Sequence, residues 1–501
     1  MQKAKERCKK WYTQLDKVCE TCWFPYSFVI LAALFLLFFS KSTSPLFTFE
    51  GLDSAVFKSM GQAILKGKVL YYDIFDNKGP ILYLINALGV LIAGRFGIFL
   101  LQIVGLSVAL LFMFKTARLF CGGFWSLLSV AVSLVLLSVF FDEGNQCEEW
   151  MLYVFAPSLY LSMKWYCDLQ TDKACAFDRR RLLRDSLLYG LFFGYALFIR
   201  PNDAVGFVGG QSFAIAVVSL LNKKWNSIYY LTTGFIIGAI IVAAPIVLWF
   251  MLNDALFDLW NGMFGVNMSY AGGASMFLSL PNIKIPLLLC VLTMCVVTYC
   301  RGGKTMLVMV MCPLCLLFLL VGHRMFFHYY IVFIPYVTVG FSYARKVPAS
   351  TAVLGAMVIF LSQPMDHNER HVPLIRQFRH QFSKRNVNQE QQSMLREGEL
   401  LVSHIPEEER DFVWNDILYS LFPIFPHNGI VQCNRQIFDY EDNLVYQKYI
   451  HQTLGSTIEK PLWVVSSSQT QDTLLTSKNT PYCKVFATEH YVLYQLMPYV
   501  E

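Results

Sequence analysis

Four acidic residues and a lysine lie close together in the polar segment after the first long apolar run. They are Glu50, Asp53, Asp73, Asp76 and Lys78. A carboxylate can act as a general base that removes a proton from a hydroxyl or an amine, and a lysine ammonium can hold a phosphate. The group therefore favours proton transfer beside a bound phosphate. An ordinary alternative stays open, because Asp53 is a typical helix N-cap at the start of a predicted helix that runs to Leu65, and loop acids are usually only solvated.

A second set of charged residues stands at the ends of long apolar segments. These residues are Glu148, Glu149, Arg200, Arg324 and His328. Ionisable groups at membrane depth are costly and usually functional. We interpret Arg200, Arg324 and His328 as a candidate phosphate clamp, and Glu148 and Glu149 as candidate acceptor-binding or metal-binding acids. Alternatively, Arg200 snorkels to the interface and His328 is an ordinary interfacial residue.

The composition indicates which elements must position these residues. Of the 501 residues, 55% are hydrophobic and only 15% are charged, and the mean hydropathy is +0.44. Soluble chains carry about 25% charged residues, so a cytosolic enzyme and a disordered chain are excluded. Apolar stretches of about 16–25 residues recur between residues 24 and 363, which predicts many transmembrane helices. The net charge of +6 is small for this length. The Lys and Arg residues lie near the ends of apolar segments, so they indicate membrane topology and not nucleic-acid binding.

The positive-inside rule predicts the topology. Residues 1–23 are basic and are predicted to be cytoplasmic, and residues 41–96 form the first outer loop. Within that loop, residues 80–94 are too short for a confident span, and we interpret them as an interfacial helix before the next crossing. Eleven spans result, at 24–40, 97–114, 123–141, 150–166, two between 184 and 223, 227–251, 284–300, 305–321, 327–343 and 350–362. The chain is thus predicted to be a multi-pass protein of the cytoplasmic membrane, with residues 24–363 as its membrane domain.

Residues 364–501 have ordinary soluble composition and are predicted to lie outside. Residues 388–402 have amphipathic helical spacing, and 411–415 and 461–465 are typical of buried strands. Residues 482–486 and 490–496 alternate as a hairpin does. Together these patterns predict a small external α/β domain.

The first outer loop also carries a family resemblance. An Asp soon after the first span, a short helix, and then Tyr71, Asp73 and Lys78-Gly79-Pro80 before an apolar run resemble the GT-C superfamily of membrane glycosyltransferases. The nearest members are the protein O-mannosyltransferases and the lipid A aminoarabinose transferase, whose loop has a K-P-P segment. Weaker similarities are Glu148-Glu149, Arg200-Pro201-Asn202 and His328-Tyr329-Tyr330.

The resemblance implies a fold and an activity. The fold would be an all-α, GT-C-like polytopic membrane domain followed by the external α/β domain. The activity would be transfer of a sugar from a polyprenyl-phosphate-linked donor to a lipid, glycan or protein acceptor of the envelope, with inversion at the anomeric carbon. Asp53 would be the catalytic base and Lys78 would contact the donor phosphate. Asp73 and Asp76 would be accessory acids that bind the acceptor or, in metal-using branches, a divalent cation.

Other classes fit the sequence less well. The main alternative is a transporter or flippase of envelope lipids or lipid-linked sugars, which predicts inverted repeats and broken helices that the sequence does not suggest. A glycan polymerase or ligase would centre on a late outer loop with Arg and His, and residues 252–283 contain neither. The segment Gly61–Val69 differs from a phosphate loop in its spacing and lacks the Ser or Thr that holds magnesium. We therefore expect no nucleotide cofactor. The expected partners are the donor, the acceptor and membrane lipids.

Overall fold

The computed structural model describes most of the membrane region and part of the C-terminal region. The residues described are 2–47, 51–72, 74, 76–141, 143–265, 267, 303–317, 327–344, 389–415, 462–467 and 482–497. Three of the candidate residues, Glu50, Asp73 and Arg324, lie outside these ranges, as do the predicted spans 284–300 and 350–362.

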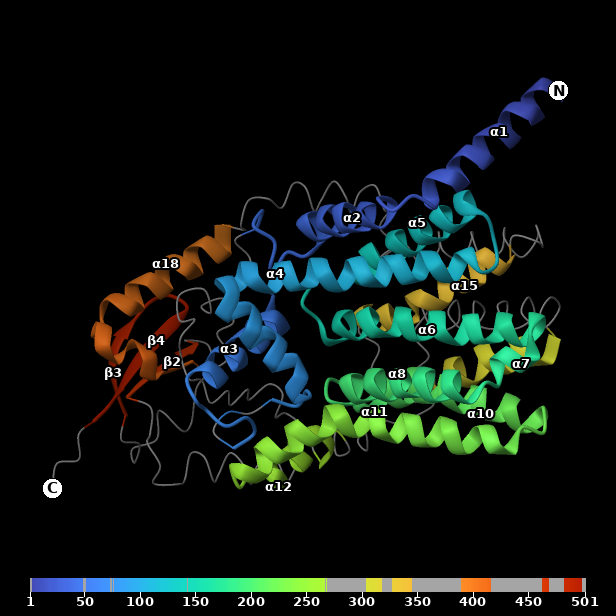
Figure 1. Cartoon of the computed structure of the whole chain (residues 1–501). Helices are drawn as coiled ribbons and strands as arrows, with labels where there is room; N and C mark the ends of the chain where they lie inside the picture. Colours follow the sequence, from blue (N-terminus) through green and yellow to red (C-terminus); the bar gives the residue numbers. More distant parts are fainter. Residues whose placement is uncertain are drawn as a thin grey trace, which may run out of the picture. The chain divides into compact units, whose positions relative to one another are not determined.

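The chain divides into two compact units (Figure 1). Unit 1 comprises Met1–Ser40, Leu100–Ile246 and Met276–Arg379, and unit 2 comprises Lys41–Phe99, Val247–Ser275 and His380–Glu501. The described helices of unit 1 are α1 (Gln2–Cys19), α2 (Phe24–Phe39), α5 (Gly123–Phe140), α6 (Cys147–Thr171), α7 (Lys173–Ala176), α8 (Arg179–Leu197), α9 (Pro201–Ala204), η1 (Val205–Gly209), α10 (Gly210–Leu221), Gly303–Leu317, η3 (Phe327–Phe333) and α15 (Ile334–Ala344). Those of unit 2 are α3 (Leu52–Leu65), α12 (Leu256–Trp260), η2 (Asn261–Gly265), α18 (Gln389–Ser403) and η4 (Glu407–Phe412). Two long helices, α4 (Pro80–Arg118) and α11 (Trp225–Leu252), contribute residues to both units.

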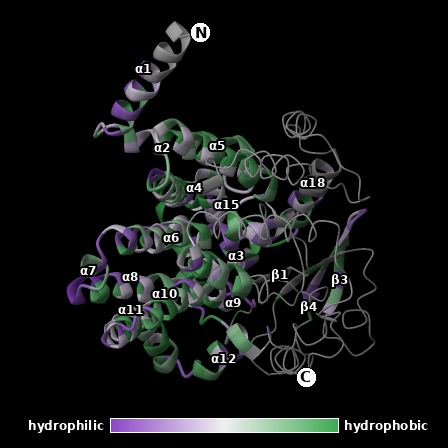
Figure 2. Ribbon diagram, turned by 90° about the vertical axis from the view of Figure 1, so that its right-hand side faces the viewer, coloured by the Kyte–Doolittle hydropathy of each residue, from purple (hydrophilic) through white to green (hydrophobic). Residues whose placement is uncertain are grey.

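The chain is a mostly helical, multi-pass membrane protein. Within the described residues, four helical segments are long and apolar enough to cross a membrane, namely Pro80–Arg118, Gly123–Phe140, Pro201–Leu221 and Trp225–Leu252. A fifth is added if α1 and α2, which meet at an angle of 84°, count together as one broken span. Hydrophobic residues prevail along α4 and α5 (Figure 2). The prediction of a multi-pass helical protein is confirmed, and the predicted count of eleven spans is not.

Helix α4 reverses direction near its start. Ala93 and Gly94 have non-helical backbone angles, and Gly94 has a φ of +58°, which glycine adopts without the steric cost that other residues meet. A Cβ on Gly97 would lie 1.9 Å from the carbonyl oxygen of Gly89, although residues eight apart in a straight helix are separated by about 12 Å. Residues 80–92 thus fold back on the helix that follows. The sequence prediction that 80–94 is separate from the span at 97–114 is confirmed.

Small residues allow the helices of unit 1 to pack closely. Gly190 of α8 has room for no side chain, because a Cβ there would lie 2.1 Å from the carbonyl oxygen of Phe235 in α11. Gly238 is equally crowded, at 2.2 Å from the carbonyl oxygen of Leu187. Gly190 therefore faces Gly238, and one turn earlier Gly234 faces Ser186. One turn later Gly194 faces Val242. Small residues at such contacts are typical of membrane helices. Elsewhere, a 2.7 Å hydrogen bond between the hydroxyls of Ser133 and Thr338 joins α5 to α15.

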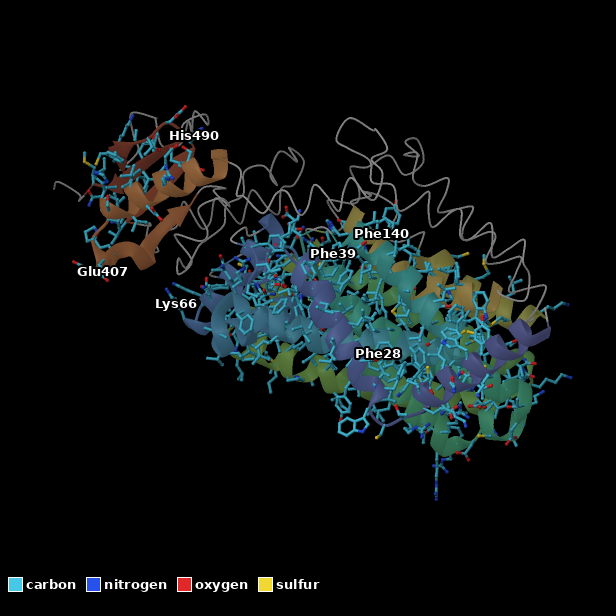
Figure 3. The ribbon with its side chains drawn as sticks, turned by 90° about the horizontal axis from the view of Figure 1, so that it is seen from above. Phe28, Phe39, Lys66, Phe140, Glu407 and His490 are labelled. Carbon is cyan, nitrogen blue, oxygen red and sulfur yellow. The ribbon has the colours of Figure 1, made fainter. Side chains whose placement is uncertain are left out.

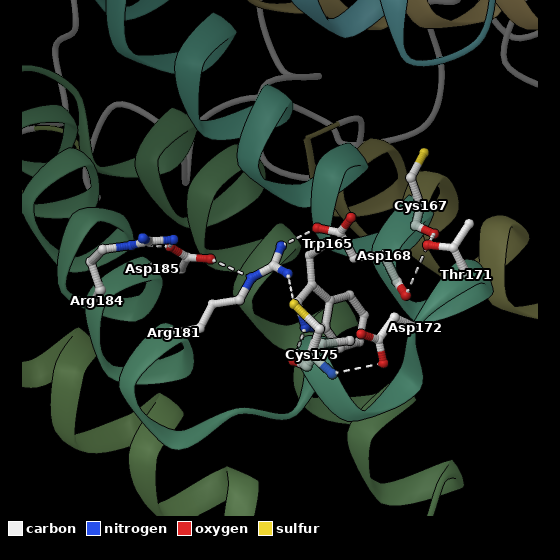
Figure 4. A network of polar contacts seen from close by, with 10 residues as sticks. Trp165, Cys167, Asp168, Thr171, Asp172, Cys175, Arg181, Arg184 and Asp185 are labelled. Carbon is white, nitrogen blue, oxygen red and sulfur yellow. Dashed lines mark hydrogen bonds and ion pairs between the residues drawn. The ribbon is translucent and has the colours of Figure 1, made fainter.

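A polar network ties the ends of α6, α7 and α8 together (Figure 4). The Arg181 guanidinium forms ion pairs with Asp168 and with Asp185, the latter at 3.3 Å. The Asp172 carboxylate accepts hydrogen bonds from the backbone amides of Ala174 and Cys175 and so caps α7. The network consists of mutually satisfied charges, so we assign it a structural role.

The C-terminal part of unit 2 contains a four-stranded sheet. The strands are β1 (Val413–Asn415), β2 (Trp463–Ser467), β3 (Tyr482–Ala487) and β4 (Tyr491–Leu496), in the order β1-β2-β4-β3. β1 and β2 are parallel, while the β3–β4 hairpin and the β2–β4 pair are antiparallel. Leu401 and Ile405 cover the sheet by packing on Trp463, Val465 and Leu493. The strands and α18 lie where the sequence predicted them.

Candidate functional site

The loop between α3 and α4 places Asp76 and Lys78 next to each other. Asp76 is buried, and its two carboxylate oxygens accept hydrogen bonds from the Tyr83 hydroxyl at 2.8 Å and from the backbone amide of Asn77 at 2.7 Å. Lys78 is half-buried, and its backbone amide donates to the same Tyr83 hydroxyl at 3.1 Å. The structure therefore joins two residues that the sequence grouped, through a tyrosine that the sequence analysis did not single out.

Asp53 lies in the first turn of α3 but does not cap it. The N-cap is Gly51, and no side chain makes a capping hydrogen bond there. The backbone amide of Gly51 instead donates to the Ser42 hydroxyl at 2.9 Å. The alternative interpretation of Asp53 as the N-cap is thus wrong, because the helix begins at Leu52 and Asp53 lies inside its first turn. The half-buried carboxylate of Asp53 is left at the positive end of the helix dipole, where a negative charge is stabilised.

Arg95 holds the loop that leads to Asp53. Its Nη2 atom donates to the carbonyl oxygens of Lys41 at 2.8 Å, Ser44 at 3.1 Å and Phe47 at 2.6 Å. Arg95 directly follows the reversal of α4, so the turn at Gly94 places this guanidinium. The α3 helix itself packs on residues 80–92 at Gly61, where a Cβ would lie 2.5 Å from the backbone nitrogen of Ala87.

A buried charge cluster forms around Arg200 in unit 1. The guanidinium forms ion pairs with Glu148, in the first turn of α6, and with Asp203 of α9 at 3.4 Å. It also lies 3.9 Å from the ring centroid of Tyr329, whose ring has an edge contact with His328 at 4.9 Å. Three of the sequence candidates thus gather here: Glu148, Arg200 and His328. A phosphate at Arg200 would compete with two carboxylates, which the sequence analysis did not foresee because it did not consider Asp203.

Glu149 has different surroundings from those of its neighbour. Its carboxylate is fully buried and accepts hydrogen bonds from the Gln102 amide at 2.9 and 3.0 Å and from the Asn145 backbone amide at 2.7 Å. The Tyr153 hydroxyl donates to it as well. These contacts tie the start of α6 to α4 and fix the direction in which the preceding loop enters the helix.

Other candidates are placed less favourably. Tyr71, which could stack on a sugar by its residue type, is completely buried and cannot do so. Asp73 and Arg324 lie outside the described residues, so their predicted roles stay predictions.

One group of side chains in the described part of the chain has the spacing of metal ligands. It consists of Glu397, Glu489 and His490 in the C-terminal domain. The His490 ring lies beside α18 and bonds to the Glu397 carboxylate at 2.6 Å (Figure 3), and the His490 backbone amide donates to the same carboxylate at 3.0 Å. Burial opposes ionisation of Glu397, but hydrogen bonds from Thr488 and His490 outweigh it and lower the Glu397 pKa. This carboxylate therefore already fastens the β3–β4 hairpin to α18.

Known structures were compared with this architecture. No protein-family model matches the chain, and no curated protein matches it in sequence. The crystal structure of ArnT from Cupriavidus metallidurans, bound to undecaprenyl phosphate, matches with a TM-score of 0.60 over 95% of this chain and 98% of ArnT. The fold of this chain is similar to that of ArnT. The sequence identity is 12%, so the similarity concerns the fold.

Archaeal oligosaccharyltransferases also match. AglB from Archaeoglobus fulgidus, in complex with an inhibitory peptide and a dolichol-phosphate, has a TM-score of 0.48 and 11% identity over 89% of this chain and 69% of AglB. A structure of the same enzyme tethered to an acceptor peptide has a TM-score of 0.48 and 13% identity over 90% of this chain and 70% of that one. The match to ArnT confirms, as a similarity of fold, the resemblance to GT-C glycosyltransferases that the first outer loop predicted.

Proposed function

We propose that the protein is a GT-C-type glycosyltransferase that moves a sugar from a polyprenyl-phosphate-linked donor to an acceptor of the cell envelope. The observation that carries the proposal is the similarity of fold to ArnT along nearly the whole length of both chains. The matched ArnT structure contains undecaprenyl phosphate, which is the lipid phosphate that such a donor would release. The charged residues of the first outer loop support the same chemistry.

Asp53 is the proposed catalytic base. Its carboxylate takes the proton of an acceptor hydroxyl or amine as that group attacks the anomeric carbon from the face opposite the phosphate. A new bond forms from the acceptor to the anomeric carbon, and the bond from that carbon to the phosphate oxygen breaks. The configuration is inverted, and the polyprenyl phosphate leaves with the bonding electron pair. The Lys78 ammonium stabilises the negative charge that grows on this phosphate.

The remaining candidates have supporting roles in this proposal. Asp73 and Asp76 are accessory acids of the same loop, while Glu148 and Glu149 are proposed to serve the acceptor. Arg200, Arg324 and His328 are the proposed clamp for the donor phosphate, with the buried ion pairs of Arg200 limiting how far its guanidinium can move. A divalent cation is compatible with these acids, and no nucleotide takes part. The acceptor is a lipid, a glycan or a protein.

The proposed location follows from the positive-inside rule. The protein is placed in the cytoplasmic membrane with residues 1–23 inside, the first outer loop 41–96 and the C-terminal domain 364–501 outside, and eleven spans between them. A donor carried by a lipid phosphate is then used at the outer face.

The substitution Asp53→Asn tests the proposal. It removes the base but keeps the size and polarity of the side chain, so expression and folding should be normal while transfer is lost. A strain that lacks the gene is complemented with wild-type protein, Asp53→Asn or the control Asp254→Asn, and envelope glycolipids and glycoproteins are compared by mass spectrometry. Asp254 is an exposed aspartate with a φ of +54°, which asparagine also tolerates, so the control should restore the wild-type pattern.

Two outcomes would contradict the proposal in different ways. Full restoration by Asp53→Asn would remove Asp53 from the catalytic role. If loss of the gene changes the distribution of lipids between the two leaflets but changes no glycan mass, the result would favour a transporter or flippase.

A further inference from the structure

Two tyrosine hydroxyls hold the peptide groups on either side of Lys78. The Lys78 backbone amide donates to the Tyr83 hydroxyl at 3.1 Å, and the Lys78 carbonyl accepts a hydrogen bond from the Tyr71 hydroxyl. Both tyrosines have no exposed surface. Because buried hydroxyls have no water to exchange with, these bonds fix the backbone of Lys78 more firmly than exposed bonds would.

Asp76 determines how Tyr83 acts. The Tyr83 hydroxyl has one proton, and it donates this proton to the Asp76 carboxylate at 2.8 Å. Its lone pair is then directed at the Lys78 amide. A charged acceptor makes a stronger hydrogen bond than a neutral one, so Asp76 orients the tyrosine. The carboxylate of Asp76 thus acts on Lys78 through Tyr83.

Tyr71 is held in an unusual conformation by its surroundings. Its φ is +65°, in a left-handed region that a bulky residue adopts only at a steric cost. The ring stacks on Phe250 with centroids 5.7 Å apart, and a Cβ on Gly262 would lie 2.4 Å from it. A glycine is therefore needed at position 262 to admit the ring. The ring packing compensates for the backbone strain and delivers the hydroxyl to the Lys78 carbonyl.

We propose that Tyr83, oriented by Asp76 and assisted by Tyr71, is a positioning residue for Lys78. This inference rests on the proposed function, in which the Lys78 ammonium binds the phosphate of the lipid. A lysine side chain is long and flexible, so a fixed Cα reduces the volume that the ammonium must search. Misplacement of a binding group by about 1 Å is enough to impair a site. Asp76 then orients Tyr83 and so fixes the loop around Lys78, and it does not contact the acceptor.

A double-mutant cycle tests the inference with undecaprenyl phosphate as the probe. The full-length protein and its variants are purified in detergent, and the dissociation constant of undecaprenyl phosphate is measured by native mass spectrometry. Tyr83→Phe removes only the hydroxyl, and the loss of one such hydrogen bond should weaken binding by about three- to ten-fold. Lys78→Met should weaken it at least as much. The double variant should bind no more weakly than Lys78→Met alone, because without the ammonium its position no longer matters.

A matched control and a second variant accompany the cycle. Tyr189 is another buried tyrosine whose hydroxyl is hydrogen-bonded, at 2.8 Å to the hydroxyl of Ser162 in unit 1. Tyr189→Phe should leave binding unchanged. Tyr71→Phe removes the hydrogen bond to the Lys78 carbonyl and should also weaken the binding of undecaprenyl phosphate. This second variant keeps the inference testable if Tyr83→Phe does not fold.

The outcomes separate the inference from the proposed function. If Lys78→Met weakens binding while both tyrosine variants bind normally, or if the effects of Tyr83→Phe and Lys78→Met add, the positioning role is overturned and the role of Lys78 stands. If Lys78→Met binds as the wild type does, the phosphate-binding role of Lys78 is overturned, and the positioning role falls with it.

Discussion

At the residue scale, the surroundings of Arg200 modify the role that its type suggests. An arginine at a helix end near a membrane surface favours a phosphate ligand, yet here Glu148 and Asp203 flank the guanidinium. One cation between two carboxylates leaves one net negative charge. Because Glu148 and Asp203 are both completely buried, the ion pairs with Arg200 offset part of the cost of burying their charges.

These ion pairs predict an asymmetry between two substitutions. Arg200→Met leaves two buried carboxylates with no cation between them, and the removal of one partner of a buried ion pair costs about 3–5 kcal/mol. Glu148→Gln leaves a neutral pair of Arg200 and Asp203 and should cost less. Thermal unfolding of the purified full-length variants should show the larger fall in Tm for Arg200→Met. The reverse order would mean that Glu148, and not the arginine, organises the cluster.

At the element scale, close contact between helices determines which helix faces meet, and the hydrophobicity of each helix does not. α11 is apolar around its whole circumference, so its composition does not indicate which face meets α8. That face is defined by Gly238 against Gly190, with Gly234 one turn earlier against Ser186. Since Arg200 follows the end of α8 by three residues, this contact also positions the charge cluster.

The contact predicts different outcomes for two Gly→Ala substitutions. Gly190→Ala would drive a methyl group to 2.1 Å from a backbone carbonyl of α11, and such overpacking costs about 1–3 kcal/mol. Gly209→Ala is the matched control, because the nearest atoms there are 3.6 Å away, an ordinary van der Waals distance. Gly190→Ala should lower the Tm in detergent and Gly209→Ala should not. Equal Tm values for the two variants would mean that α8 and α11 are not in close contact.

At the scale of the whole molecule, the chain combines apolar helices long enough to cross a membrane with a β-sheet and α18, which belong to the same compact unit as residues 41–99. The sheet is covered by α18, and hydrogen bonds between Glu397 and His490 fasten the β3–β4 hairpin to this helix. The topology predicted from charge places residues 364–501 on the outer side of the membrane and residues 1–23 on the inner side.

Accessibility of single cysteines tests this topology. Cys22 is exposed near the N-terminus, and Met497, which follows β4, is 54% exposed. In intact cells, a membrane-impermeant maleimide should label a variant whose single cysteine is Met497→Cys and should not label one that keeps only Cys22. Permeabilised cells provide the control, since both variants should then react. Labelling of Cys22 in intact cells would invert the topology and place the C-terminal domain inside.

The sequence by itself determined the membrane class, helix α3, the separation of residues 80–94 from the next span, and the elements of the C-terminal domain. These features depend on local patterns: hydropathy over about 20 residues, the positions of Lys and Arg beside apolar runs, and alternation in strands. It also grouped Asp53, Asp76 and Lys78, which lie within one loop and one helix. The glycine pairs of α8 and α11 were readable in the sequence as well, but not the fact that they meet.

Only the tertiary structure decided which side chains share an environment. Arg200 reaches Glu148, 52 residues earlier in the chain, because the fold brings the start of α6 to the end of α8. Tyr83 joins Asp76 to Lys78 within a short stretch of chain, but the packing around it decides that its hydroxyl is buried between them. The same packing buries Tyr71 and excludes it as a sugar platform. Such pairings follow from the directions in which whole helices approach, and no local pattern encodes that direction. The physical reason is that a residue's type limits its chemistry, whereas burial and neighbours determine which part of that chemistry it can use.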